Sequence, residues 1–265
     1  MQRKNGIRQL YTAAVISLTC LAFVFVPAVA LHAQTAAVVK NIVIVHGAFA
    51  DGSGWENVYK ILKQRGYHVT MVQNPLTSLE DDVAATERVV DKLQGPVVLV
   101  GHSWGGTVIT QAGNAAKVVS LVYVAAFVPD EGETSLDLIK SAAPDADNGI
   151  LPPDEKGFVY YDSAKFRAGF VADVSQEKAD FMFASQAPIA VRCFLRPVTR
   201  AAWKTKPSYA IVAAEDKSIN PEIERRVYKR AGSIVTEIKG SHALFIAKAN
   251  AVADVIEAAA HAPTR

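Results

Sequence analysis

Cysteine is nearly absent from this chain. Its 265 residues include only Cys20 and Cys193, too few for the disulfide framework of a small secreted domain. We expect Cys20 to leave with an N-terminal segment, which removes the only possible internal partner of Cys193. The histidines and cysteines are too scattered along the chain for a zinc site. The sequence therefore predicts neither a disulfide nor a metal centre.

An excess of charge of one sign is also missing. The chain has 28 basic and 26 acidic residues, and no run of lysine or arginine suggests a nucleic-acid footprint. Neither glycine-rich nucleotide motif, G-x-G-x-x-G or G-x-x-x-x-G-K-[ST], is present, so we predict no cofactor. These absences leave small molecules as the expected partners, and they leave the oligomeric state open.

The first 33 residues differ in composition from the remainder. Residues 1–12 carry three basic and no acidic side chains, residues 13–30 are almost wholly apolar, and Ala30 and Ala33 end candidate cleavage motifs. This pattern is typical of a secretory signal peptide, so we expect an exported, periplasmic or secreted mature domain at 34–265. The alternative is an uncleaved anchor, because about 18 apolar residues can span a bilayer. The small residues before the cleavage motifs favour removal, and no stable membrane anchor is expected.

Apolar runs rich in β-branched residues alternate with amphipathic stretches in the mature part. Six runs have the pattern of strands buried on both faces, at residues 41–45, 68–72, 97–100, 119–125, 209–213 and 234–238. Helical patterns occupy residues 55–65, 79–93, 104–115, 221–231 and 248–260. This alternation predicts an α/β fold with a doubly wound, mostly parallel sheet of about six strands. Before the second helix, Ser78 is the expected N-cap, and the acidic run 80–82 is explained as favourable charge at a helix start.

One long stretch interrupts the alternation. From about residue 127 to 206 no strand-like run occurs, while prolines and aromatics are frequent. Ligands bind at the carboxyl ends of the strands in open α/β sheets, so we expect a mainly helical lid over that edge. Its aromatic side chains are expected to line part of an apolar pocket, for example Phe166, Phe170, Phe181, Phe183 and Trp203. The alternative, a linker to another domain, is disfavoured because the strand pattern resumes at residue 209.

The strongest chemical signal directly follows the apolar run at 97–100. Residues 101–105 read Gly-His-Ser-Trp-Gly, which is the G-x-S-x-G pattern in a strand–turn–helix context. A sharp turn of this kind leaves room only for very small residues two positions from the serine. It also lifts Ser103 clear of the sheet, as a nucleophile requires. A glycine-rich turn with an idle serine is the weaker explanation.

A serine hydroxyl needs a base to take its proton. His242 is the expected base, because it lies in the loop between the last predicted strand and the last predicted helix. The acid should follow the strand at 209–213, which makes Asp216 the choice and Glu215 the alternative. The other histidines of the mature part are interpreted as structural or exposed, and these are His46, His68, His102 and His261.

Two backbone N–H groups are needed to stabilise the oxyanion of such a reaction. The Trp104 N–H at the helix start is the first, and the loop after the first strand supplies the second, from Ala48 or its neighbour Phe49. Gly47 lets this loop approach the substrate carbonyl closely. The side chains of Phe49 and Trp104 are predicted to be substrate-binding pocket walls, with a place in the core as the alternative.

Four segments in order resemble a known family: HGAFADGSGW, GHSWGG, AAEDKSI and GSHALFI. They are similar to the small α/β-hydrolases that include plant methyl-salicylate-type esterases, hydroxynitrile lyases and bacterial esterases, some of which act on pyrethroids. The resemblance covers about residues 40–260 and implies an α/β-hydrolase fold. It further implies a triad and two oxyanion donors, at Ser103, Asp216, His242, Ala48 and Trp104.

The expected activity is cofactor-free hydrolysis of a small carboxylic ester through an acyl-enzyme on Ser103. A hydroxynitrile-lyase-like enzyme and a small-molecule binding protein are the alternatives. The lyases resembled here carry threonine at the position of Gly47 and lysine at that of Ala243, which disfavours cyanohydrin cleavage. A binding protein has no need of a base and an acid, so the presence of His242 and Asp216 favours an enzyme. The ester itself stays open.

Overall fold

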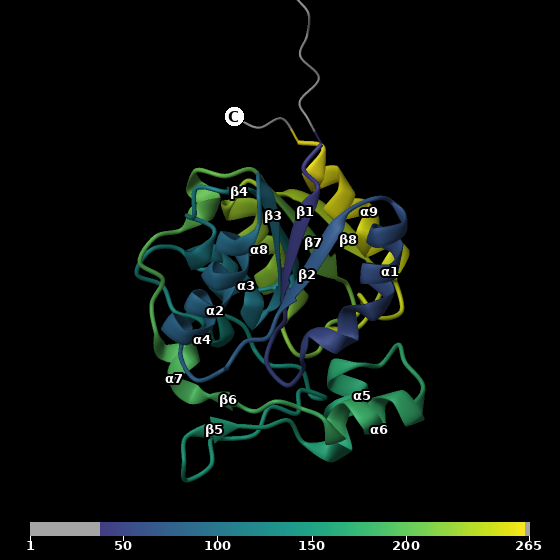
Figure 1. Cartoon of the computed structure of the whole chain (residues 1–265). Helices are drawn as coiled ribbons and strands as arrows, with labels where there is room; N and C mark the ends of the chain where they lie inside the picture. The colour runs from purple at the N-terminus through teal and green to yellow at the C-terminus, as the bar shows by residue number, and fades with distance from the viewer. Residues whose placement is uncertain (1–37, 263–265) are drawn as a thin grey trace, which may run out of the picture. The chain divides into compact units, whose positions relative to one another are not determined.

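The computed structural model describes residues 38–262, so the predicted signal peptide at 1–33 lies outside the described residues. Six strands form one sheet in the order β2-β1-β3-β4-β7-β8, and every neighbouring pair is parallel (Figure 1). The strands are Asn41–Val45 (β1), His68–Val72 (β2), Val97–Ser103 (β3), Val118–Ala126 (β4), Ser208–Ala213 (β7) and Ile234–Ile238 (β8). The predicted parallel sheet is confirmed. No helix within residues 38–262 is long and apolar enough to cross a bilayer.

Helices cover both faces of this sheet (Figure 1). Helices α1 and α9 pack together on one face, and α2, α3 and α8 lie on the other. The predicted N-cap is confirmed, because Ser78 Oγ accepts the Asp81 N–H at 3.0 Å. The helices are Glu56–Gln64 (α1, preceded by the 3-10 helix η1, Gly52–Trp55), Leu79–Lys92 (α2), Trp104–Ala112 (α3), Pro221–Arg230 (α8) and Ala249–Ala260 (α9).

The parallel topology brings distant parts of the sequence to one edge. Strand β3 lies in the middle of the sheet with every residue buried, as an apolar strand between two helix layers requires. Because all six strands run the same way, the loops after β1, β3, β7 and β8 leave from the same edge. The residues that the sequence predicts to be catalytic or oxyanion donors all lie in these loops or at the direct junction of β3 and α3.

The insertion, residues 127–206, connects β4 to β7 and belongs to the same compact unit as the sheet. In Figure 1 the part that contains α5, α6, β5 and β6 lies beyond one end of the sheet. The expectation that the insertion has no strand is wrong, because β5 and β6 pair antiparallel. Each has only two residues, which is too short for a recognisable sequence pattern. Its elements are Ser135–Lys140 (α4), Phe158–Val159 (β5), Ser163–Phe170 (α5), Gln176–Ala184 (α6), Ile189–Ala190 (β6), Val191–Leu195 (α7) and Ala202–Lys204 (η2).

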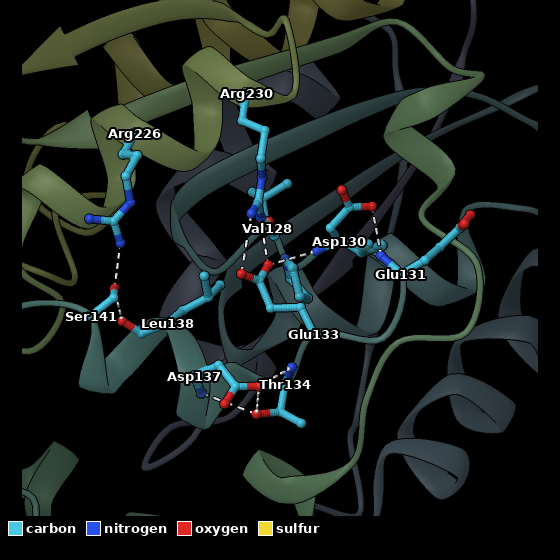
Figure 2. Close-up of polar contacts among 12 residues, drawn as sticks. Val128, Asp130, Glu131, Glu133, Thr134, Asp137, Leu138, Ser141, Arg226 and Arg230 are labelled. Atoms are coloured by element: carbon cyan, nitrogen blue, oxygen red, sulfur yellow. Dashed lines mark hydrogen bonds and ion pairs between the residues drawn. The ribbon is translucent and has the colours of Figure 1, made fainter.

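Two arginines of α8 hold the beginning of the insertion against the main fold (Figure 2). Arg230 donates to the Glu133 carboxylate at 2.6 Å and to the Val128 carbonyl at 2.7 Å. Arg226 contacts the hydroxyl of Ser141, the residue that ends α4. These contacts fix α4, whose side chains contribute to the cavity described below, relative to the sheet.

Candidate active site

The turn between β3 and α3 has the geometry of a nucleophile elbow. Ser103 is the last residue of the strand and has φ +54°, a conformation that non-glycine residues rarely adopt. A Cβ on Gly101 would lie 2.5 Å from the Gly105 carbonyl oxygen, and one on Gly105 would lie 2.4 Å from the Val45 oxygen. The predicted steric need for glycine on both sides of Ser103 is confirmed.

His242 and Asp216 meet from two different loops. His242 Nδ1 lies 2.5 Å from Asp216 Oδ2, and both side chains are buried. The other carboxylate oxygen, Oδ1, accepts the N–H groups of Ser218 and Ile219 at 2.7 and 2.8 Å. Asp216 is thus oriented by its own loop toward the imidazole. Glu215, the alternative acid, instead pairs with Lys239, with 3.5 Å between Oε1 and Nζ.

A second buried carboxyl lies next to Asp216, and the sequence reasoning missed it. Glu224 of α8 is fully buried, and its Oε2 accepts the Ala213 N–H at 3.0 Å. Burial, together with the nearby charge of Asp216, raises the pKa of Glu224 well above its usual value. Its position between the buried residues Ile223 and Val227 on an amphipathic helix was the available signal.

The other four histidines have structural contacts or are exposed. His46 Nε2 accepts the Asn74 N–H at 2.9 Å, and burial lowers the pKa of His46. His102 is buried, and its Nε2 lies 3.1 Å from the His242 carbonyl oxygen. His68 and His261 are exposed at the start of β2 and the end of α9. Within residues 38–262 no group of three His, Cys, Asp or Glu side chains is arranged to hold a metal ion.

The backbone around Ser103 offers two free N–H groups. Trp104 is the first residue of α3, so its N–H has no intrahelical acceptor. The Phe49 N–H donates to the Ala187 carbonyl at 3.0 Å and is therefore occupied. The Ala48 N–H has no hydrogen-bond partner among the described residues. Of the two alternatives after β1, Ala48 is the one whose N–H remains available to an oxyanion.

A cavity of about 310 Å³ opens over this constellation and is mainly apolar. Ser103, His242, Ala48 and Phe49 line one part of it, which places the predicted nucleophile and base at the same cavity. No lysine, arginine, aspartate or glutamate is among its lining residues. The remaining lining residues are Phe127, Leu136, Ile139, Pro144, Asn148, Ile150, Leu151, Pro153, Val159, Phe170, Val191, Phe194, Ser218 and Ile219.

The side chain of Trp104 does not line this cavity, so its predicted role as a pocket wall is wrong. Its indole is fully buried and donates from Nε1 to Asp82 Oδ2 at 2.7 Å. Asp82 is itself fully buried and also accepts the Leu76 N–H at 2.8 Å. The explanation of residues 80–82 as helix-start charge is therefore wrong for Asp82. Burial raises the pKa of Asp82 to about 6.

Only one of the five insertion aromatics predicted for the pocket lines it. Phe170 does so, while Phe166 stacks behind it at 5.2 Å between ring centroids, and Phe183 packs on Phe166. Phe181 is 62% exposed, and the indole of Trp203 donates to a backbone carbonyl of the insertion. The other insertion residues of the lining are mostly aliphatic and come from α4, β5, α7 and the loops between them, and their direction toward the cavity has no signature in the sequence.

Comparisons with known proteins agree with this architecture. A family model described as "Alpha/beta hydrolase family" matches residues 42–255. A carbendazim hydrolyzing esterase from Nocardioides sp. (strain SG-4G) is 34% identical over 146 residues, which cover 50% of this chain and 54% of that esterase. A pyrethroid hydrolase from Sphingobium wenxiniae is 26% identical over 251 residues, covering 85% of this chain and 89% of the relative.

A solved structure shares the fold over nearly its whole length. The crystal structure of a pyrethroid hydrolase from Sphingobium faniae JZ-2 superposes with a TM-score of 0.72 at 21% identity, covering 84% of this chain and 98% of that one. At this identity the similarity establishes the fold. The resemblance inferred from four sequence segments is confirmed.

Proposed function

The chain belongs to the alpha/beta hydrolase family, and from this premise we propose that it is a cofactor-free serine hydrolase that cleaves a small carboxylic ester. The observation that carries the proposal is that Ser103 and His242 line one apolar cavity, while Asp216 Oδ2 lies 2.5 Å from His242 Nδ1. The names of the relatives, an esterase and a pyrethroid hydrolase, support an ester as substrate.

Acylation begins with the ester carbonyl next to Ser103. His242 Nε2 takes the hydroxyl proton while Ser103 Oγ bonds to the carbonyl carbon, and the carbonyl oxygen becomes an oxyanion. In this proposal the N–H groups of Ala48 and Trp104 stabilise that charge, which is supported by the absence of a backbone acceptor for either group among the described residues. When the carbon–oxygen bond to the alcohol breaks, the protonated His242 gives its proton to the leaving alkoxide, and the acyl group stays on Ser103.

Deacylation repeats these steps with water. His242 takes a proton from water as the hydroxide oxygen bonds to the acyl carbon, and it returns this proton to Ser103 Oγ when the acid leaves. Asp216 keeps the Nδ1 proton of His242 in place and stabilises the imidazolium of both half-reactions. The net change is one ester and one water consumed for one acid and one alcohol.

Labelling with a fluorophosphonate probe tests this proposal, because the probe reacts with an activated serine. We expect the wild-type protein to be labelled at Ser103 and to hydrolyse p-nitrophenyl esters. Ser103→Ala should fold, escape labelling and lose activity by about 10³-fold or more. Turnover near the wild-type rate by Ser103→Ala would contradict the mechanism.

The lack of space for a side chain at Gly47 also disfavours the lyase alternative. A Cβ on Gly47 would lie 2.7 Å from Ser103 Cβ, so the threonine of the lyases does not fit this backbone. The small-molecule binding protein is disfavoured because the buried contact between His242 and Asp216 has a use in catalysis and none in passive binding. A protein that bound esters and never reacted with the fluorophosphonate would favour binding instead.

We further propose that the protein is exported and that residues 1–33 direct this. The basic, apolar and small-residue segments described above support this proposal.

A further inference from the structure

The loop that carries His242 has no regular secondary structure of its own. It runs from the end of β8 at Ile238 to the start of α9 at Ala249. Nevertheless, His242 Nε2 must stay aligned with Ser103 Oγ, because a misplacement of about 1 Å can reduce the rate about 100-fold. Asp216 holds the Nδ1 side of the ring, but the backbone that carries the ring needs its own support.

Three consecutive residues of this loop are hydrogen-bonded to other segments. The Ser241 N–H donates to Asp173 Oδ2 at 2.6 Å, and the Ala243 N–H donates to the Phe170 carbonyl at 3.0 Å. Between them, the His242 carbonyl accepts from His102 Nε2 at 3.1 Å. His102 belongs to the elbow, whereas Phe170 and Asp173 belong to the insertion.

The insertion thus accepts the N–H groups of both residues that adjoin His242. Phe170 ends α5, and Asp173 follows three residues later in the loop before α6. A Cβ on Gly240 would lie 3.2 Å from Asp173 Oδ2 and 2.9 Å from Leu244 Cβ, so glycine allows the carboxylate its close approach. The Phe170 ring also packs on the imidazole, with 4.9 Å between centroids.

We propose that Asp173 is a positioning residue, which aligns His242 for catalysis by holding the Ser241 N–H. The insertion then does more than cover the cavity, because one of its carboxylates keeps the base in place. This inference rests on the proposed serine hydrolase function. The side chain of Asp173 is exposed, so its removal leaves the Ser241 N–H to water and does not open the core.

The experiment compares Asp173→Ala and Asp173→Asn with the wild type by kcat and KM on a p-nitrophenyl ester and by the rate of fluorophosphonate labelling. We expect Asp173→Ala to lower kcat and the labelling rate about tenfold at unchanged KM, because the ester pocket is intact. Asp173→Asn keeps an oxygen that accepts the Ser241 N–H, so it should stay within about threefold of the wild type. Thermal unfolding of each variant is measured alongside.

Asp180→Ala is the matched control. Asp180 is another exposed aspartate of the insertion, and its carboxylate accepts from Gln176 on its own helix at 2.7 Å. This variant should keep wild-type kcat. If Asp173→Ala is too unstable to assay, Asp173→Ser, whose hydroxyl is too short to reach Ser241, takes its place with the same expected loss.

The outcomes separate two questions. Labelling of the wild type at Ser103 is measured first and decides the proposed hydrolase function. The proposal for Asp173 is then overturned by a kcat of Asp173→Ala within twofold of the wild type, by an equal loss in Asp173→Asn, or by an equal loss in Asp180→Ala. A loss confined to KM would also overturn it, since it would assign Asp173 to substrate binding.

Discussion

At the scale of single residues, both carboxylate oxygens of Asp216 have partners. One oxygen faces His242 Nδ1, and the other accepts two N–H groups of the loop that follows β7. An amide in its place can present an N–H to His242 Nδ1, which forces the proton onto Nε2, the atom that must accept from Ser103. The geometry of this one side chain thereby selects the tautomer of the base.

Asp216→Asn should therefore lower kcat by about 10³-fold or more with little effect on the fold. Glu215→Gln is the matched control and should keep activity within about twofold, because the Glu215 side chain pairs with Lys239 and not with His242. Steady-state hydrolysis of a p-nitrophenyl ester measures both. The reverse result, with Glu215→Gln inactive and Asp216→Asn active, would identify Glu215 as the catalytic acid in place of Asp216.

Asp82 has a pKa raised by burial to about 6 from 3.8. The folded state therefore binds this proton more tightly than the unfolded state does. The contribution of Asp82 to the free energy of unfolding is fully present below pH 3.8 and is lost as the pH rises through 6. A pKa shift of this size corresponds to about 3 kcal/mol of the free energy of unfolding between pH 3.8 and 6.

We expect Asp82→Asn to remove this part of the pH dependence. Urea unfolding of the wild type and the variant between pH 4 and 7 gives the free energy of unfolding at each pH. The two proteins should differ in the slope of this free energy against pH. Asp81→Asn is the control, because hydrogen bonds from Thr77 and Ser78 lower the pKa of Asp81, so its contribution to stability is instead lost as the pH falls. If the free energy of unfolding had the same pH dependence in the wild type and in Asp82→Asn, the raised pKa of Asp82 would be contradicted.

At the scale of elements, the insertion is tied to both loops that flank Ser103. The Ala187 carbonyl accepts the Phe49 N–H beside the proposed oxyanion donor, and the Phe170 carbonyl accepts the Ala243 N–H beside the base. The same segment supplies much of the cavity lining, including Ile150 and Val159. Under the proposed function, substrate choice and catalytic alignment both depend on this one insertion.

Substitutions on the cavity-lining part of the insertion should reorder ester preference. Ile150 lines the cavity while being 38% exposed, so Ile150→Ala should change relative kcat/KM across acyl lengths by about 1 kcal/mol or more without unfolding the protein. Leu195→Ala is the control, since Leu195 is 50% exposed and does not line the cavity. Labelling by a small fluorophosphonate should stay unchanged in both. An unaltered ester ranking in Ile150→Ala would assign specificity to Phe49 and the sheet side.

At the scale of the whole molecule, the described residues, 38–262, contain the six-stranded sheet and the candidate site. We expect the protein, expressed with its own leader in a Gram-negative host, to be recovered from the periplasm without its first 30 or 33 residues. Intact mass spectrometry measures the cleavage position. A full-length mass in the membrane fraction would identify residues 1–33 as an anchor.

The sequence alone was sufficient for the sheet and for the core of the site. All six strands were predicted. Strands β1, β3, β4 and β7 are almost wholly buried and so need continuous apolar runs, which are a local signal. The edge strands β2 and β8 are partly or largely exposed, so their apolar runs are not explained by burial on both faces. The elbow was predicted because the backbone there has no room for a Cβ beside Ser103. His242 and Asp216 followed from their places after strands whose carboxyl ends must share an edge.

Only the tertiary structure decided which side chains face the cavity and which partners support the site. Trp104 turns toward Asp82, Glu224 lies behind Asp216, and Asp173 meets Ser241 across 68 positions of sequence. The periodicity of an element tells which face is buried, but not which other element covers it. That choice depends on the packing of segments far apart in the chain, whose contacts leave no repeat, motif or spacing in the sequence itself.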